Sequence, residues 1–231
     1  HPMRTYTLRW KHFELQLGQR TAIMGIVNVT PDSFSDGGRF HGADAAVAQA
    51  ERLVAEGADI IDIGGESTRP FAEEVSAAEE IDRVVPVIRR LAGLIPVPIS
   101  IDTTKAAVAE AALTAGAAMV NDIGALGLDA GMGAVAARHQ VPVVIMHMRG
   151  SPRTMQIDPV YDDLIAEVYQ FLQAAMARAE AAGIPRNHII IDPGIGFGKT
   201  LAHNLLLIQK LALFADLEVP ILIGPSRKAF I

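Results

Sequence analysis

The feature that most constrains this chain is a regular alternation, beginning at Ala22, between short β-branched runs and longer Ala-rich amphipathic segments. This alternation is typical of parallel βα units, in which each helix returns the chain to the start of the next strand. The runs are apolar at consecutive positions, as expected for parallel strands that are covered on both faces. Seven strands are predicted, at Ile23–Val29, Ile60–Ile63, Ile99–Ile101, Met119–Asn121, Val143–Met146, Ile189–Ile191 and Ile221–Ile223.

Apolar residues three and four positions apart predict the connecting helices. The clearest helical segments are Ala43–Glu56, Lys105–Thr114, Tyr161–Ala182 and Leu201–Leu213. The segment Thr5–Leu17 is predicted to form a small hairpin that plugs a barrel floor. The predicted fold class is therefore α/β, a (β/α)8 TIM barrel with an N-terminal β-hairpin. Because seven units do not close an eight-stranded barrel, the eighth βα unit is expected to be missing from the chain as given.

Length and composition indicate one domain that binds a small molecule. With 231 residues, half of them hydrophobic and no linker-like stretch, residues 3–231 are expected to form a single domain, and His1 and Pro2 are interpreted as a cloning remnant. The net charge of −6 argues against nucleic acid or an anionic membrane as a partner. The apolar runs are far shorter than the ~20 residues of a membrane helix. We expect a cytoplasmic protein.

The absence of cysteine excludes thiolate nucleophiles, disulfides and cysteine zinc sites. His139, His188 and His203 lack the pairing of metal ligands, so a zinc site is not expected. A metal, if one is used, is expected to take oxygen or imidazole ligands.

Polar residues gather at the carboxyl ends of the predicted strands, an edge that we call the rim and where α/β-barrel enzymes have their active sites. The first two strands lead into long polar segments, residues 30–38 and 64–70, which are expected to act as mobile lids. The other polar residues of the rim are Asp102, Asn121, Asp122, His147, Asp192 and Ser226-Arg227-Lys228.

Four of these residues together suit a flat heteroaromatic ring that carries an amide and an exocyclic amine, because such a ring needs both acceptors and donors. The four are Asp102, Asn121, Asp192 and Lys228. For any one Asp or Asn alone, capping of the following helix is an equally good interpretation. Asp62, inside a strand, is expected to make a structural hydrogen bond, and the lone His147 is interpreted as structural.

The segment Asp192–Thr200 ends in Gly-Lys-Thr between a strand and a helix, which resembles a phosphate-binding P-loop. The spacing argues against one, because Pro193 stands where the first glycine is needed and Gly194 follows one residue too late. We interpret these glycines as allowing a tight turn or a close approach of the backbone to a ligand.

Two long segments, Gly25–Gly38 and Asp62–Pro70, resemble the signatures of the dihydropteroate synthase family. Shorter segments resemble the family in the expected order, so that the resemblance runs from Ile23 to Ile231. They are Ile101–Thr103, Asn121–Ile123, Met146–Met148, Asp192–Lys199 and Ser226–Lys228. The resemblance implies a transferase of folate biosynthesis that condenses 6-hydroxymethyl-7,8-dihydropterin diphosphate with p-aminobenzoate to give 7,8-dihydropteroate and diphosphate. It also implies inhibition by sulfonamides.

The resemblance assigns roles to particular residues. The pterin would be held by Asp102, Asn121, Asp192 and Lys228, with Met146 and Phe197 packing near its ring. The p-aminobenzoate and diphosphate sites would involve Phe34, Thr68, Arg69 and Ser226. Asp102, Lys228 and Arg69 would act in catalysis, and Asn28 would contact Mg²⁺ bound to the diphosphate.

Two departures from the family pattern are visible. Phe71 follows Pro70 where the family commonly has glycine, and no segment matches the Arg-x-His pair of the family's last strand. The family also implies a homodimer whose contact is made by its final helices, so a chain without them is expected to lose both turnover and that contact. The alternatives left open are a methyltetrahydrofolate-binding methyltransferase of the same fold and a non-catalytic binding module.

Overall fold

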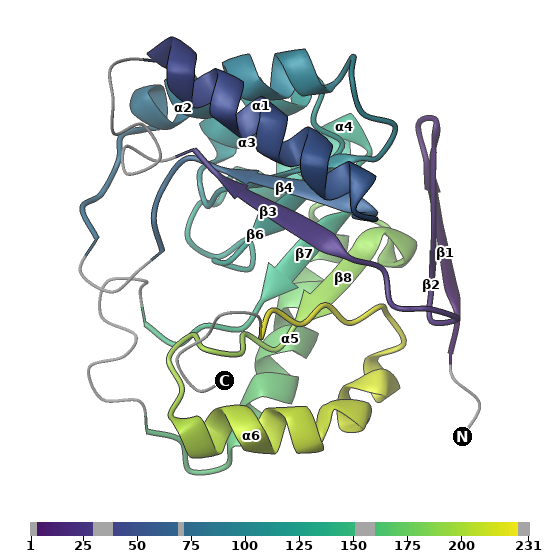
Figure 1. Cartoon of the computed structure of the whole chain (residues 1–231). Helices are drawn as coiled ribbons and strands as arrows, with labels where there is room; N and C mark the ends of the chain where they lie inside the picture. Colours follow the sequence, from purple (N-terminus) through teal and green to yellow (C-terminus); the bar gives the residue numbers. More distant parts are fainter. Residues whose placement is uncertain (1–3, 30–38, 69–71, 151–159, 226–231) are drawn as a thin grey trace.

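The computed structural model describes residues 4–29, 39–68, 72–150 and 160–225. Several predictions fall outside these ranges: the first polar segment, residues 30–38 with Phe34, the end of the second with Arg69, Pro70 and Phe71, and Ser226, Arg227 and Lys228. The chain begins with an antiparallel hairpin of β1 (Tyr6–Trp10) and β2 (Phe13–Leu17), followed by a parallel sheet and its helices (Figure 1).

Six parallel strands form one sheet in which each strand pairs with the next in chain order. They are β3 (Met24–Asn28), β4 (Ile60–Gly64), β5 (Ile99–Asp102), β6 (Met119–Asp122), β7 (Val143–Met146) and β8 (Ile189–Asp192). Every residue of β4, β7 and β8 is buried, because helices cover one face of the sheet and side chains of neighbouring strands crowd the other. This arrangement confirms the predicted α/β fold class.

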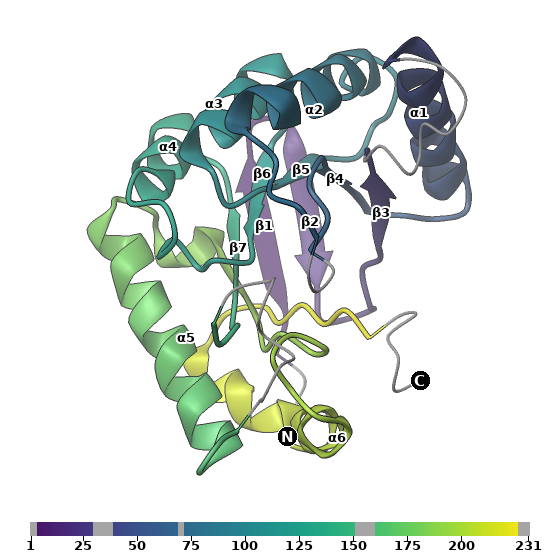
Figure 2. The ribbon, with the colours of Figure 1, turned by 90° about the vertical axis from the view of Figure 1, so that its left-hand side faces the viewer.

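The helices lie in an arc around the outer side of the sheet (Figure 2). They are α1 (Arg39–Ala55), α2 (Ala77–Leu91), α3 (Ala106–Ala115), α4 (Met132–His139), α5 (Leu164–Ala181) and α6 (Leu201–Gln209), with 3₁₀ turns at Arg186–His188 and Leu211–Leu217. Side-chain caps start several of them: Ser76 accepts from Glu79 N before α2, and Thr200 accepts from His203 N before α6. No helix within the described ranges combines the length and the apolar character that crossing a bilayer requires.

Some predicted elements are shorter than expected, among them α5, which begins at Leu164 and not at Tyr161. The seventh strand, Ile221–Ile223, is reduced among the described residues to a single parallel bridge between Ile221 and Ile191. Leu222 N donates to Ile191 O over 2.8 Å, so the segment lies beside β8, where a seventh strand belongs. Helix α6 ends at Gln209 and not at Leu213, because the chain continues into a 3₁₀ turn after Lys210.

Within the described residues the sheet stays open, with β3 at one edge and β8 near the other. Its open edge explains why Ile26 of β3 is 54% exposed although it lies inside a strand. Of the predicted eight-stranded barrel, the described residues form six adjacent strands, in the order expected for a barrel, and one further bridge.

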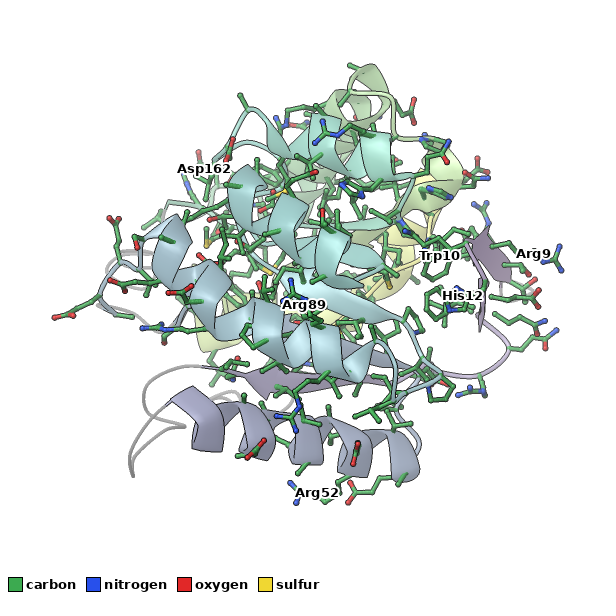
Figure 3. The ribbon with its side chains drawn as sticks, turned by 90° about the horizontal axis from the view of Figure 1, so that it is seen from above. Arg9, Trp10, His12, Arg52, Arg89 and Asp162 are labelled. Carbon is green, nitrogen blue, oxygen red and sulfur yellow. The ribbon has the colours of Figure 1, made fainter. Side chains whose placement is uncertain are left out.

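The hairpin lies at the amino end of the sheet, where the sequence predicted it. Leu8, Trp10 and Leu15 are buried, and Trp10 Nε1 donates a hydrogen bond of 2.8 Å to the carbonyl of Ala118, just before β6. Figure 3 shows Trp10 pointing from the hairpin toward the sheet and Arg9 pointing away. The hairpin thus covers the floor opposite the rim.

We predict that Trp10→Phe lowers the free energy of unfolding by about 1–3 kcal/mol, because it leaves the buried carbonyl of Ala118 without its donor. Urea unfolding followed by circular dichroism measures this, since Trp10 is the only tryptophan. Arg9→Gln on the same strand is the control, because its ion pair with Glu14 is exposed and should change stability by less than about 0.5 kcal/mol. Equal effects of both substitutions would contradict the prediction.

Candidate active site

Three predicted site residues lie in one row across the rim. The strand register places Asn28 of β3 beside Gly64 of β4, and Gly64 beside Asp102 of β5. Asp102 in turn stands beside Asn121 of β6. Residues in register on parallel strands point to the same face, so these side chains gather on one side of the sheet. Gly64 adds no side chain to the row; a Cβ there would lie 3.5 Å from the carboxyl of Asp102.

Asp62 lies two residues before Gly64 on β4 and faces the same side, beneath the row. It is 2% exposed, and its Oδ2 accepts a 3.3 Å hydrogen bond from Asn121 Nδ2. Burial raises the pKa of Asp62 to about 6, against the opposing effect of Ser100 and Asn121. The expected structural hydrogen bond is therefore present, and it orients the amide of Asn121 at the rim.

The half-buried carboxyl of Asp102 lies among other acidic groups. Burial, followed by the negative charges of Asp62, Glu80, Asp122 and Glu66, raises its pKa well above the ordinary value. Such a carboxyl favours a ligand that brings hydrogen-bond donors or positive charge, since either relieves the repulsion.

Asp192 ends β8 and is buried, in register with Met146 of β7. Its Oδ1 accepts a 2.8 Å hydrogen bond from Gly194 N, so it also shapes the turn that follows. Gly194 has a φ of +76°, and a Cβ there would stand 1.9 Å from the carbonyl oxygen of His147. Only glycine fits at this position, which confirms the tight-turn interpretation for Gly194.

Lys199, the lysine of the P-loop-like segment, points into its own loop. Its Nζ donates to the carbonyls of Gly194 and Phe197, each over 2.8 Å, and the residue is 3% exposed. Burial lowers the pKa of Lys199 to about 7, although the negative charge of Asp192 opposes this shift. A P-loop lysine reaches outward to phosphate, so this geometry agrees with the rejection of a P-loop.

An apolar wall borders the row. Met146 packs in a small cluster with Ile123 and Met148, and the partly buried Phe197 packs against it. The cluster brings together the two residues expected beside the ring, Met146 and Phe197. An aromatic side chain and polarizable thioethers suit the face of a flat heterocycle.

Two other rim residues have a structural role. Asp122 accepts from Gly124 N over 2.7 Å and from Leu126 N over 3.0 Å, and burial raises its pKa to about 6. It therefore shapes the loop after β6 and does not cap the following helix α4, whose N-cap is Gly131. His147 is buried edge-on against Phe171, with ring centroids 4.8 Å apart, and burial lowers its pKa to about 3.

The sequence missed a charged cluster behind the rim. Lys105 Nζ donates to Glu80 over 2.7 Å and also to Glu66, and Thr103 Oγ1 donates to Glu80 over 2.6 Å. Glu80 is 1% exposed, although it looks in the sequence like one of several solvated acids on α2. We call Glu66, Glu80, Thr103 and Lys105 the Lys105 cluster. Glu66 and Thr103 lie inside family-like segments and Lys105 at the start of a predicted helix, but no local pattern pairs these residues with Glu80.

Asn28 is exposed at the end of β3, and Thr68 is the last described residue of the second polar segment. Within the described ranges, no three acidic or histidine side chains come together as a metal site. The single amide oxygen of Asn28 fits a cation that keeps waters and takes most of its ligands from a phosphorylated substrate.

Comparison with known proteins identifies the family of this chain. The model of the pterin-binding enzyme family matches residues 24–231. The chain belongs to the pterin-binding enzyme family. It is 51% identical over 214 residues to the dihydropteroate synthase of Synechocystis sp., a match that covers 93% of this chain and 74% of that relative. The resemblance drawn from the sequence motifs is thereby confirmed.

Solved structures of this family agree with the fold. The chain matches a Yersinia pestis dihydropteroate synthase in complex with a sulfonamide drug at a TM-score of 0.91 and 48% identity, covering 97% of this chain and 81% of that one. It matches a Xanthomonas albilineans dihydropteroate synthase with 4-aminobenzoic acid at a TM-score of 0.87 and 50% identity, covering 94% of this chain and 77% of that one.

We predict that the stability of the Asp62→Asn variant relative to wild type increases as pH rises. The raised pKa of Asp62 means that its protonated form contributes stability below about pH 4, and this contribution is lost as pH rises through about 6. The free energy of unfolding of the variant relative to wild type should therefore increase by about 2–3 kcal/mol from pH 4 to pH 7.5. Urea unfolding at both pH values measures it.

The control is Asp216→Asn, an exposed position in the 3₁₀ turn after α6. Its difference from wild type should stay below about 0.5 kcal/mol at both pH values, because surface substitutions change stability little. A pH-independent difference for Asp62→Asn would mean that folding does not raise the pKa of Asp62.

Proposed function

We infer that this chain is a dihydropteroate synthase, a transferase that joins p-aminobenzoate to a pterin diphosphate. The observation that carries the inference is the row of Asn28, Asp102 and Asn121 at the rim, beside an apolar wall, in a chain that matches pterin-binding enzymes over residues 24–231. The relatives that match most of the chain are dihydropteroate synthases, which disfavours the methyltransferase and binding-module alternatives.

The pterin is proposed to bind along the row and against the wall. Asp102, Asn121 and Asp192 face the N–H groups and the amide of the ring, with Lys228 as a donor to its acceptors. Met146 and Phe197 pack against the ring face. The contact between Asn121 and Asp62 supports this assignment, because it holds the amide in one orientation before the ligand arrives.

The arylamine and the diphosphate are proposed to bind at the end of the row near Thr68, with Phe34, Arg69 and Ser226 as the further contacts that the family resemblance implies. Thr68 lies four residues after Gly64, the row position at the end of β4, and so stays near this part of the rim, which supports the placement. The 4-aminobenzoic acid in the Xanthomonas albilineans relative supports the identity of the second substrate, and the sulfonamide drug in the Yersinia pestis relative supports sulfonamides as inhibitors.

The proposed reaction breaks the bond between the pterin methylene carbon and the diphosphate oxygen, which keeps the electron pair. The arylamine nitrogen then forms a bond to that carbon and loses a proton. Arg69 and Lys228 stabilise the departing diphosphate, and the carboxyl of Asp102 stabilises the positive charge that develops on the pterin. No covalent intermediate with the protein is needed.

Asn28 is proposed to contact Mg²⁺ that arrives with the diphosphate. When bound, this ion neutralises charge on the leaving group. The exposed amide of Asn28 at the end of the row supports the assignment, because it offers one oxygen ligand beside the place where the diphosphate would lie.

We further propose one pterin-binding domain, a cytoplasmic location and a homodimer. A diphosphate ester does not cross membranes, so the enzyme should share the compartment in which its substrate is made. The dimer is supported by an apolar stripe on α6, where Leu201, Leu205 and Ile208 are 55%, 53% and 41% exposed. Light scattering measures the assembly state.

The test of the function is the release of diphosphate from 6-hydroxymethyl-7,8-dihydropterin diphosphate with Mg²⁺. Release that requires p-aminobenzoate and stops on removal of the metal with a chelator would support the proposal. Pterin binding without release, in a protein extended to the full length of its relatives, would overturn it.

We predict that Asp192→Ala nearly abolishes pterin binding, because it removes a buried acceptor at the rim. Asp192→Asn is the sharper variant, since its amide oxygen still accepts from Gly194 N and so preserves the turn. It should weaken pterin binding about 10–100-fold by calorimetry, through loss of a charged acceptor. Asp216→Asn is the matched control and should bind as wild type. Near-normal affinity of the Asp192 variants would remove this residue from the site.

A further inference from the structure

The Lys105 cluster connects the second polar segment to the helical framework. Lys105 stands just before α3, Glu80 lies on α2, and Glu66 is the second residue after β4. The ammonium of Lys105 bridges the two carboxylates, one of them almost fully buried and the other with 29% of its side chain exposed. The cluster therefore joins three separate elements through one side chain.

The two arms of this bridge differ in rigidity. Glu80 is held on its second oxygen by the hydroxyl of Thr103 over 2.6 Å, and that same hydroxyl accepts from Lys105 N over 3.2 Å. Lys105 and Glu80 thus form a closed, hydrogen-bonded unit on the framework. Glu66 belongs to no helix or strand, so the position of its side chain depends on its contact with Lys105.

The residue before Glu66 is also held against α2. The carbonyl of Gly65 accepts a 2.8 Å hydrogen bond from Arg83. A Cβ at Gly65 would lie 2.9 Å from Val84 Cγ1, so the backbone approaches the helix as closely as glycine permits. Backbone and side-chain contacts together fix where the chain leaves β4 for Ser67 and Thr68.

We propose that Lys105 is a positioning residue for the synthase reaction: anchored to Glu80, it holds Glu66 and thereby sets the place of Ser67 and Thr68 at the p-aminobenzoate and diphosphate end of the site. The inference rests on the proposed function. The pterin end should respond little, because Asp102 and Asn121 are strand residues whose positions are set by the sheet.

The test is Glu66→Gln, which weakens the arm to the polar segment and leaves the buried pair of Lys105 and Glu80 intact. The variant replaces an ion pair by a weaker hydrogen bond to a neutral amide oxygen, which should raise KM for p-aminobenzoate about three- to tenfold. The affinity for the pterin diphosphate, measured by calorimetry without p-aminobenzoate, should stay within about twofold, on the same grounds.

Substitutions at Lys105 complete the test. Lys105→Arg keeps a cation between the two carboxylates and should restore most of the p-aminobenzoate affinity that Lys105→Met loses. Lys210→Met, at an exposed position after α6, is the matched control and should leave both substrates unaffected. Lys105→Met leaves the buried carboxylate of Glu80 without its cation, which destabilises the fold. Glu66→Gln alone is therefore sufficient to test the proposal.

An unchanged KM for p-aminobenzoate in Glu66→Gln would overturn the proposal, as would equal weakening of both substrates. All these variants are made in a protein extended to the full length of its relatives, and a wild-type protein of that length that binds pterin but never releases diphosphate would overturn the proposed function instead. The two failures are distinguishable, because the first is seen only in the variant and the second already in wild type.

Discussion

Backbone hydrogen bonds between parallel strands set the heights at which polar side chains meet at the rim. Asn28, Asp102 and Asn121 come from three strands that lie far apart in the sequence, and only the sheet register puts them in one row. A slip of one residue in any strand would turn its side chain to the opposite face, so the row depends on a register that the buried apolar runs specify. The apolar wall and the loops are arranged around this row.

Four acidic side chains lie close together at the rim and just behind it. The pKa is raised for each of them, with burial as the first cause: Asp62, Asp102, Asp122 and Glu80. Backbone N–H groups compensate Asp122, while Lys105 and Thr103 compensate Glu80. Asp102 keeps the least relief among the described contacts, and such imbalances are characteristic of sites that await a ligand.

Several parts of the fold and the site follow from local patterns. Each strand prediction lay within two residues of the observed boundaries except the seventh, because apolar runs and their polar ends are properties of the chain itself. The glycines after Asp192 were interpreted correctly as a tight turn, since a φ of +76° at Gly194 excludes other residues. The seventh strand was wrong in extent because strand length depends on neighbours, and the described residues give Ile221 a partner only on the side of β8.

The sequence by itself determined the α/β class, the order of the strands, the hairpin and the motifs that identify the family, because these depend on periodicity and on residues close together in the chain. Only the tertiary structure decided which polar residues are buried and which of them form hydrogen bonds or ion pairs with one another. Glu80 looks solvated on its helix yet is 1% exposed, and Lys199, for which the sequence indicated no partner, bonds the carbonyls of its own loop. The physical reason is that burial and charge pairing depend on distances across the fold, which no local pattern specifies.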